Sequence, residues 1–267
     1  MEFIVNIDQF EKMIDNKIIG MPELINTKIN FRGKNNILVC DNNIKLEGAL
    51  LEFNGDNSIV YLRSSLAEGF NLTVYNNSTI FIGKNNKFCS SVSVNVFEGM
   101  NLIIGDDCLF EDNVVISTSD YYLIYDVNSK ERINFSSSIF IGDHVWLGAN
   151  TYISKGVKIG SGTIVAPTSF IPPYSNCHSN CYLFGNPVKI IKDNVFFINQ
   201  SVGPLKTTDS VDSEYYKSDI FIYKIINNET LSMRNIDEIL FGLDIDSRLE
   251  FIQKLFIRNK RKNRFAL

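Results

Sequence analysis

The sequence lacks a long apolar run, and no stretch approaches the roughly 20 residues that a membrane-spanning helix needs. Its first residues, MEFIVNIDQFEKMIDN, carry early acidic residues and lack the basic start and apolar centre of a secretory signal peptide. Both absences predict a cytoplasmic protein. The formal net charge of −4 also lacks the basic excess typical of nucleic-acid-binding proteins, so we expect no nucleic-acid partner.

Histidine and tryptophan are scarce. The two histidines are His144 and His178, and five cysteines include Cys177 and Cys181, which are separated by three residues. A structural zinc site usually needs a second Cys or His pair at a similar spacing. The sequence has none, so we expect no metal.

The sequence does contain a six-residue repeat. Five apolar-headed hexads follow one another without a break, and they read Ile141-Gly-Asp-His-Val-Trp, Leu147-Gly-Ala-Asn-Thr-Tyr, Ile153-Ser-Lys-Gly-Val-Lys, Ile159-Gly-Ser-Gly-Thr-Ile and Val165-Ala-Pro-Thr-Ser-Phe. An aliphatic residue at every sixth position, followed by a small residue, matches neither the helix nor the strand period. It is the hexapeptide period of a parallel β-helix, in which three hexads close one triangular coil.

Weaker copies of the repeat extend toward the N-terminus, where Ile82-Gly83 and Ile104-Gly105 reproduce the start at Ile141. The predicted fold class is therefore all-β, a hexapeptide-repeat parallel β-helix with a protruding loop and a C-terminal helical extension. The predicted parts are an N-terminal cap at 1–25 with a helix over 8–16, a β-helix domain at 26–195, and a linker with the helical extension at 196–267.

The segment 123–138 breaks the sixfold register between Ile116 and Ile141. A long excursion from a repeat scaffold usually carries function or assembly contacts, although a tolerated surface insertion is the alternative. Apolar residues over 235–262 recur at helical spacing, and we expect these helices to cap the open end of the solenoid or to pack between protomers.

The chain ends in a basic tail that contains Arg258, Lys260, Arg261, Lys262 and Arg264. Such a run is usually solvated, and contact with an anionic polymer is the alternative.

Three segments carry a resemblance to a known family, and they read IGDDCLFEDNVVISTSD, YDVNSKERINFSSSIFIGDHVWLGANTYISKGVKIGSGTIVAP and FGNPVKIIK. They resemble the left-handed β-helix hexapeptide acyltransferases, most of all the bacterial capsular polysaccharide and polysialic acid O-acetyltransferases. The resemblance implies a left-handed coil, a homotrimer of parallel prisms, acetyl-CoA bound between neighbouring protomers and a saccharide acceptor. Peripheral association with a polysaccharide assembly complex is left open.

The family's general base is a histidine just before the excursion, in a Ser-Asp-x-His-Pro-Ile setting. The sugar hydroxyl must lose a proton as it attacks the thioester, and imidazole titrates near neutral pH. Here Tyr122 stands at the histidine position and Leu123 at the proline position. A phenol of pKa about 10 is only about one-thousandth ionised at pH 7, which costs about 4 kcal/mol. The adjacent Asp120 is normally too weak a base, which leaves His144 as a further candidate, although the family's histidine there is not the base.

The resemblance implies roles for other residues as well. Trp146 would hold the thioester or the acceptor through its indole N–H, and Asn95 would orient the acceptor. The implied cofactor-binding residues are Ala149, Pro167, Lys189 and Lys192. The first two occupy hexad edges where family backbone groups meet the pantetheine, and the lysines would contact the CoA phosphates.

Two interpretations of function follow. The first is an acetyl-CoA-dependent O-acetyltransferase that acts on a bacterial surface sugar of a capsule or lipopolysaccharide. The alternative is a catalytically impaired family member with a binding or structural role, because Tyr122 replaces the histidine. A nucleotide-sugar N-acetyltransferase also remains open. A β-helix adhesin or ice-binding surface would need long threonine ladders and a secretion signal, and the sequence shows neither.

Overall fold

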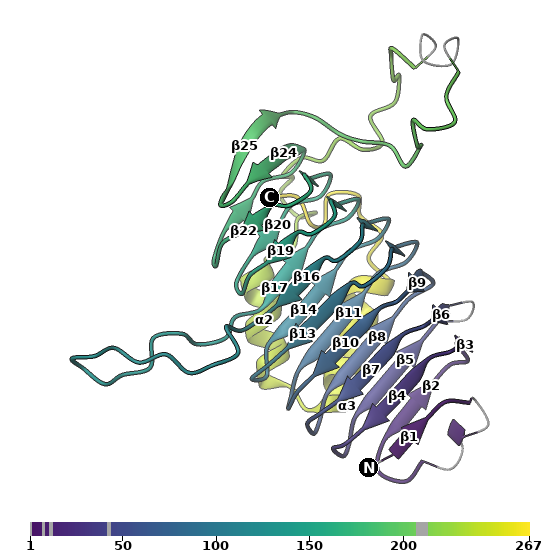
Figure 1. Ribbon diagram of the computed structural model, residues 1–267, viewed down its shortest axis with the longest axis vertical. Coiled ribbons are helices and arrows are strands. Elements are labelled where there is room, and N and C mark those ends of the chain that lie inside the picture. Colours follow the sequence, from purple (N-terminus) through teal and green to yellow (C-terminus); the bar gives the residue numbers. More distant parts are fainter. Residues whose placement is uncertain (1, 7–8, 11–12, 42–43, 207–212) are drawn as a thin grey trace.

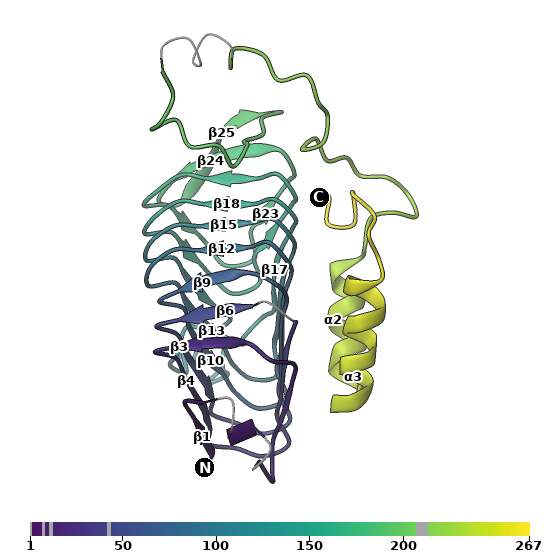
Figure 2. The ribbon, with the colours of Figure 1, turned by 90° about the vertical axis from the view of Figure 1, so that its right-hand side faces the viewer.

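The computed structural model of the protein describes residues 2–6, 9–10, 13–41, 44–206 and 213–267. Three sheets form the faces of a parallel β-helix in this part of the chain, with an arm that projects from one side and helices that lie along another (Figures 1 and 2). This arrangement confirms the predicted fold class, including the protruding loop and the C-terminal helical extension. None of the described helices is long and apolar enough to cross a membrane.

The chain visits the three sheets in a fixed order, B to C to A, once in every coil. Sheet A contains β1 (Glu2–Ile4), β4 (Lys28–Phe31), β7 (Leu50–Phe53), β10 (Asn71–Val74), β13 (Ser93–Val96), β16 (Val115–Ser117), β19 (Tyr152–Ile153) and β22 (Phe170–Ile171). Sheet B contains β2 (Lys17–Ile19), β5 (Ile37–Cys40), β8 (Ile59–Leu62), β11 (Thr79–Ile82), β14 (Asn101–Ile104), β17 (Ile139–Ile141), β20 (Lys158–Ile159) and β23 (Asn176–Cys177). Sheet C contains β3 (Glu23–Ile25), β6 (Lys45–Glu47), β9 (Leu66–Glu68), β12 (Lys87–Phe88), β15 (Leu109–Phe110), β18 (Trp146–Leu147), β21 (Ile164–Val165), β24 (Cys181–Gly185) and β25 (Val188–Asp193).

The coils differ in length between the two halves of the β-helix. In the N-terminal half, Ile37 on β5 pairs with Ile59 on β8, so this coil takes 22 residues. In the C-terminal half, Phe140 on β17 pairs with Lys158 on β20, so the coil takes 18 residues, or three hexads. From β4 to β14 the strands of sheets A and B have four residues, whereas those of the last coils have two. The strict hexads are therefore confined to the narrow half, which explains why the repeat before Ile141 is weak in the sequence.

The core changes with the coil length. Aromatic rings fill the wide half, where Phe31 stacks on Phe53 and Phe88 stacks on Phe110, each at 4.4 Å between ring centroids. Aliphatic side chains fill the narrow half, and Ile141, Ile153, Ile159, Val165 and Ile171 are all fully buried. Because protein interiors are close-packed, the larger cross-section requires the larger side chains.

Glycine at the second hexad position is a packing requirement. A Cβ atom added at Gly105 would lie 2.6 Å from the carbonyl oxygen of Gly142 in the next coil. A Cβ atom at Gly142 would in turn lie 2.6 Å from the backbone nitrogen of Ser161. These glycines let successive coils approach each other at the B–C edge.

The β-helix begins earlier than expected. β2 and β3 already pair in parallel with β5 and β6, so part of the cap expected over 1–25 belongs to the first coil. Of the helix expected over 8–16, residues 8, 11 and 12 lie outside the described residues. Residues 9–10 form a short 3-10 segment, and 13–16 are not helical.

The C-terminal helices pack along the side of the β-helix and do not cap its open end (Figure 2). They are α2 (Met233–Gly242), α3 (Ile245–Ile252) and a π-helical turn at Gln253–Ile257. Their apolar faces cover the outward side of sheet B, where Phe256 stacks on Phe81 at 4.8 Å. Arg248 is buried in this contact and donates to the carbonyl oxygens of Asn57 (2.5 Å) and Asn77 (2.8 Å).

The arm (residues 118–138) leaves sheet A after β16 and returns to sheet B at β17 (Figure 1). Arg132 anchors it through a bidentate ion pair with Glu98, at 2.7 and 2.8 Å. Hydrogen bonds from Arg132 hold the pKa of Glu98 at about 2. The arm also exposes many large apolar side chains, namely Tyr122, Leu123, Ile124, Tyr125, Val127, Ile133 and Phe135.

Candidate functional site

The predicted site residues separate into two groups on opposite sides of the β-helix. Asn95, Asp120 and Tyr122 lie on sheet A or on the arm, next to the edge between sheets A and B. The other group belongs to the outer face of sheet C and its edges, and contains Trp146, Ala149, Pro167, Lys189 and Lys192. In a three-sided prism the A–B edge lies opposite sheet C, so one chain does not bring the two groups together.

A groove of about 270 Å³ runs over the outer face of sheet C. Its lining is mostly apolar and consists of Trp146, Ile164, Ala166, Pro167, Tyr182, Lys192 and Val195. Trp146, Ile164 and Tyr182 occupy equivalent positions on β18, β21 and β24 and form a ladder along the groove. The inward residues of the same strands, such as Leu147 and Val165, fill the core and hold this ladder in place.

The hairpin of β24 and β25 places both predicted lysines on the side of this groove. Leu183 is buried in the core, so its neighbours Tyr182 and Phe184 point outward. Tyr182 pairs with Lys192 and Phe184 pairs with Lys189, and cross-strand partners share one face. The register shift between Tyr182 and Leu183 is what lets two lysines three residues apart project to the same side.

Glu111 contacts the groove residue Trp146, and the sequence analysis did not identify it. Its Oε1 accepts from the indole Nε1 of Trp146 (3.0 Å), and its Oε2 accepts from the backbone nitrogen of Ala149 (2.9 Å). One carboxylate thus accepts hydrogen bonds from both the Trp146 indole and the Ala149 backbone N–H. The arm separates β15 from β18 in the sequence, yet Phe110 on β15 pairs with Leu147 on β18. Aligning the coils on either side of the arm would have placed Glu111 beside Gly148.

Pro167 lies at the C–A edge, one coil beyond Ala149. The backbone nitrogen of Thr168 donates to the carbonyl oxygen of Ala149 (2.7 Å), and Gly148 gives Pro167 room to approach. A Cβ atom at Gly148 would lie 2.5 Å from the nitrogen of Pro167. The glycine therefore keeps the edge of the groove open beside the proline.

At the opposite edge, Asp120 is a structural residue of the arm. Its carboxylate forms an ion pair with Lys155, whose side chain is only 5% exposed, and accepts from the Nδ2 of Asn134 (3.2 Å). Asn134 also donates to the carbonyl oxygen of Tyr122 (2.7 Å) and accepts from the backbone nitrogen of Ile124 (2.8 Å). A carboxylate engaged in this way is poorly suited to accept a substrate proton.

Tyr122 has a fixed backbone and a free side chain. Its nitrogen donates to the carbonyl oxygen of Asp120 (2.9 Å), while the residue as a whole is 84% exposed. The neighbouring Tyr121 adopts a positive φ of 68° and packs edge-on against Phe97 at 5.2 Å. The arm therefore holds Tyr122 out into solvent, away from the body of its own chain.

Asn95 lies on β13, directly beneath the start of the arm. It pairs with Ser117, the last residue of β16, and its Nδ2 donates to the Oγ of Ser93 (3.3 Å). The backbone nitrogen of Thr118 donates to the carbonyl oxygen of Asn95 (3.1 Å). Asn95 thus belongs to the same edge as Tyr122 and not to the groove.

His144 is closed off from both groups. Its ring is 1% exposed and stacks between Phe197 (4.1 Å) and Phe221 (3.9 Å). Its Nε2–H donates to the carbonyl oxygen of Phe197 (2.9 Å), and burial lowers its pKa below the ordinary value. In this structure the imidazole packs the C-terminal segment onto the B–C edge and is shielded from solvent.

His178 and the cysteines complete the set of candidate residues. The Nε2 of His178 lies 2.6 Å from an oxygen of Asp193, at the exposed end of the β24–β25 hairpin. Cys177 and Cys181 face the core of the last coil, and burial raises their pKa values to about 12 and about 11. Both cysteines therefore remain thiols and serve as small core residues.

The comparisons with known proteins point to one family. The bacterial transferase hexapeptide family (six repeats) matches residues 138–173. The crystal structure of the polySia-specific acetyltransferase NeuO superposes with a TM-score of 0.65 and 30% identity, over 74% of this chain and 93% of that chain. This chain belongs to the hexapeptide-repeat acetyltransferase family.

Two curated relatives of this hexapeptide-repeat acetyltransferase are both polysialic acid O-acetyltransferases. The relative from Escherichia coli O1:K1 / APEC is 32% identical over 174 residues, which cover 65% of this chain and 48% of the relative. The relative from Neisseria meningitidis is 28% identical over 210 residues, which cover 78% of this chain and 97% of the relative. The chain thus spans about half the length of the first relative and nearly all of the second.

The family match of this acetyltransferase falls on the narrow coils. Residues 138–173 contain four of the predicted site residues, His144, Trp146, Ala149 and Pro167. Tyr122 and the arm lie before that range, and both lysines lie after it. The matched repeat therefore positions one wall of the groove, while the departure at Tyr122 belongs to a segment outside the repeat.

Proposed function

We propose that this protein is an acetyl-CoA-dependent O-acetyltransferase that acts on an acidic bacterial surface polysaccharide. The observation that carries the proposal is the groove on sheet C, which combines an apolar ladder at Trp146, Ile164 and Tyr182 with two lysines on the same face. The two curated polysialic acid O-acetyltransferases support the choice of acceptor.

The chemistry of the groove fits acetyl-CoA, a long and mostly uncharged arm joined to phosphates. In this assignment Ile164, Ala166 and Pro167 contact the pantetheine, while Lys189 and Lys192 pair with phosphate oxygens. When bound, acetyl-CoA supplies an acetyl group activated as a thioester. The hydrogen bond from the Trp146 indole N–H to the Glu111 carboxylate must break before this N–H can donate to a ligand.

We also propose that the working unit is a homotrimer. The two groups of site residues lie on opposite sides of one chain, so a complete site requires the arm of a second copy. The exposed apolar residues of the arm, among them Tyr122, Leu123 and Phe135, support such a contact. A mass of three chains by light scattering at micromolar concentration is the expected result, and a monomer would contradict a shared site.

Proton removal is the open step of the proposal. Asp120 is engaged by Lys155 and Asn134, and His144 is buried under the C-terminal segment. Tyr122 stands at the family's histidine position and is exposed, but a phenol is a weak general base at neutral pH. These contacts favour slow transfer, and they keep a catalytically impaired, polysaccharide-binding member as the second candidate function.

The two candidates separate in one experiment. Acetyl-CoA binding is measured by calorimetry, and thiol release is then followed with polysialic acid as the acceptor. Binding with polymer-dependent thiol release supports the transferase. Binding without release supports the impaired member, and failure to bind acetyl-CoA contradicts the proposed function.

A further inference from the structure

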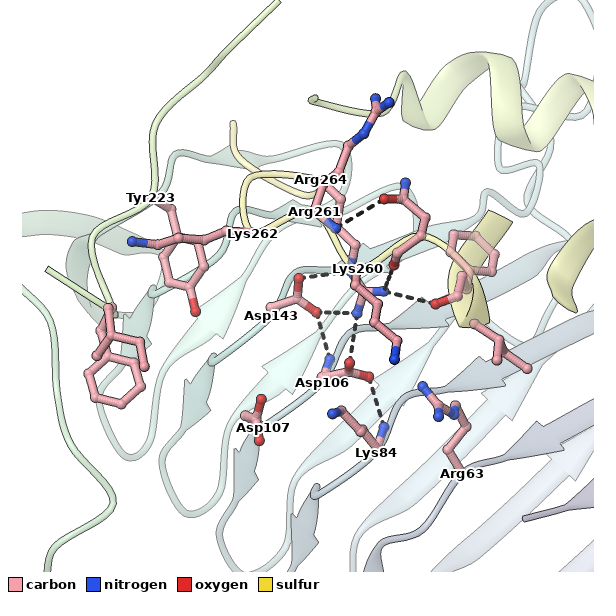
Figure 3. Close-up of a pocket in the computed structure, with 15 residues that line it drawn as sticks. Arg63, Lys84, Asp106, Asp107, Asp143, Tyr223, Lys260, Arg261, Lys262 and Arg264 are labelled. Atoms are coloured by element: carbon pink, nitrogen blue, oxygen red, sulfur yellow. Dashed lines mark hydrogen bonds and ion pairs between the residues drawn. The ribbon is translucent and has the colours of Figure 1, made fainter. Parts of the chain in front are cut away.

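We propose that a second cavity, formed between the C-terminal segment and the B–C edge of the wide coils, binds a stretch of the anionic polysaccharide. The cavity has a volume of about 400 Å³ (Figure 3), and its lining shares no residue with that of the groove. Its cationic lining comes from two sources, the β-helix and the basic tail: Arg63, Lys84, Lys260, Arg261, Lys262 and Arg264. The proposal rests on the proposed function for the identity of the polymer.

Arg264 builds the cavity and is not available to a ligand. It is buried, and its guanidinium pairs with Asp143 (2.7 Å) and Asp106 (3.1 Å). It also donates to the carbonyl oxygens of Phe256 (2.9 Å) and Asn259 (3.1 Å). The prediction of a solvated tail is therefore wrong for Arg264, which fastens the tail to the β-helix and pairs with two of the three carboxylates in the lining.

Three of the remaining cations, Arg63, Lys84 and Lys260, face one another, whereas Arg261 and Lys262 donate to the carbonyl oxygens of Asn228 and Asp219. Figure 3 shows the Lys260 side chain extending from the tail toward Arg63 and Lys84 on the β-helix. Arg63 pairs with Asp41 at 3.1 Å, whereas the side chains of Lys84 and Lys260 have no carboxylate partner among the described residues. Like charges that line one cavity repel each other, so an anion bound between them would relieve the repulsion.

The rest of the lining suits a sugar acid. Tyr223 forms an aromatic wall, with the ammonium of Lys262 lying 5.7 Å from its ring centroid. Asn259 adds an amide that can donate to or accept from hydroxyl groups. A cavity of this volume matches a small-ligand site and would take a few sugar units, but not a nucleic-acid duplex or a membrane surface. A polymer with one carboxylate per sugar unit meets these requirements.

The site would act as a second hold on the polymer. A long acceptor bound at two places on one protein gains affinity through the high effective concentration of its other segments. The cavity should therefore matter more for long chains than for short oligomers. Its cations should make binding fall steeply as salt is raised.

The test compares two charge-reversed proteins with the wild type. Lys84→Glu/Lys260→Glu alters the cavity, and Lys17→Glu/Lys28→Glu makes the same charge change at exposed lysines on the first coil. Binding of fluorescent polysialic acid to the full chain is titrated by anisotropy at low and moderate salt. We expect the cavity variant to bind at least about tenfold more weakly, because two charged contacts are lost, and the control to bind like the wild type.

Equal binding by the wild type and the cavity variant would overturn the proposal, as would equally tight binding of duplex DNA, which would indicate a general polyanion surface. Neutral dextran should not compete. Acetyl-CoA affinity, measured on the same proteins by calorimetry, should stay unchanged in the cavity variant. Loss of polymer binding with intact acetyl-CoA binding supports the cavity, while absent acetyl-CoA binding in the wild type contradicts the proposed function separately.

Discussion

The wide and narrow halves of this β-helix use the same coil order for different purposes. The wide coils, of about 22 residues, have four-residue strands in sheet B that are buried on both sides, by the aromatic core within and by α2 and α3 outside. The narrow coils, of 18 residues, leave the outer face of sheet C free for the groove around Trp146. Extra residues per coil thus provide packing surface, whereas the minimal hexad coil presents its side chains in a regular ladder.

The largest expected effect concerns the arm that joins the two halves. The substitution Tyr122→His supplies an imidazole where the family has one. General-base catalysis typically raises the reaction rate by about 10²–10⁴-fold. We expect thiol release with polysialic acid to rise by that order, while Tyr122→Phe changes the wild-type rate little. Vigorous wild-type turnover abolished by His144→Ala would instead move the base to His144.

Shortening core side chains should lower the free energy of unfolding by different amounts in the two halves. Phe88 is buried between Phe70 (4.9 Å) and Phe110 (4.4 Å), so Phe88→Ala should lower the free energy of unfolding by about 3–5 kcal/mol. Ile159→Val in the narrow half removes one methyl group and should cost about 0.5–1.5 kcal/mol. Denaturant titrations of both variants provide the measurement. Equal losses would show that the aromatic core has no special weight.

The attachment of the C-terminal segment offers a similar test. Arg264→Met leaves Asp143 buried without its partner, which typically costs about 3–5 kcal/mol. The double variant Asp143→Asn/Arg264→Met removes the orphaned charge and should recover part of the loss. Thermal unfolding of the three proteins decides the matter, since a double variant no better than Arg264→Met would show that the ion pair is not the main contact.

A smaller effect should appear as a dependence of stability on pH. Burial between Phe197 and Phe221 lowers the folded-state pKa of His144, so the native protein binds fewer protons than the unfolded chain below about pH 6.5. Stability should therefore fall as the pH drops from 6.5 toward the folded pKa. His144→Phe should reduce the change in the free energy of unfolding between pH 5.5 and 7.5. An unchanged pH dependence would mean that other groups cause it.

The sequence predicted the parts of the molecule whose signal is local. Strict hexads over 141–171 predicted the parallel coils, and the family resemblance named two residues of that stretch that line the groove, Trp146 and Pro167, but not Ile164 and Ala166. The wide coils were harder to recognise, because 22 residues per turn hide the sixfold period. The packing of α2 and α3 on sheet B and the ion pair of Arg264 with Asp143 join residues far apart in the chain, so no local pattern encodes them.

Calorimetric titration of acetyl-CoA into matched lysine variants directly tests the claim that the narrow half binds acetyl-CoA in the groove on sheet C. Lys192→Glu and Lys189→Glu should each weaken binding by about 1.5–3 kcal/mol, because a phosphate contact is replaced by repulsion. Lys158→Glu, on sheet B of the same half, should bind like the wild type. Wild-type affinity in both groove variants would contradict the claim and place the phosphates elsewhere on the protein.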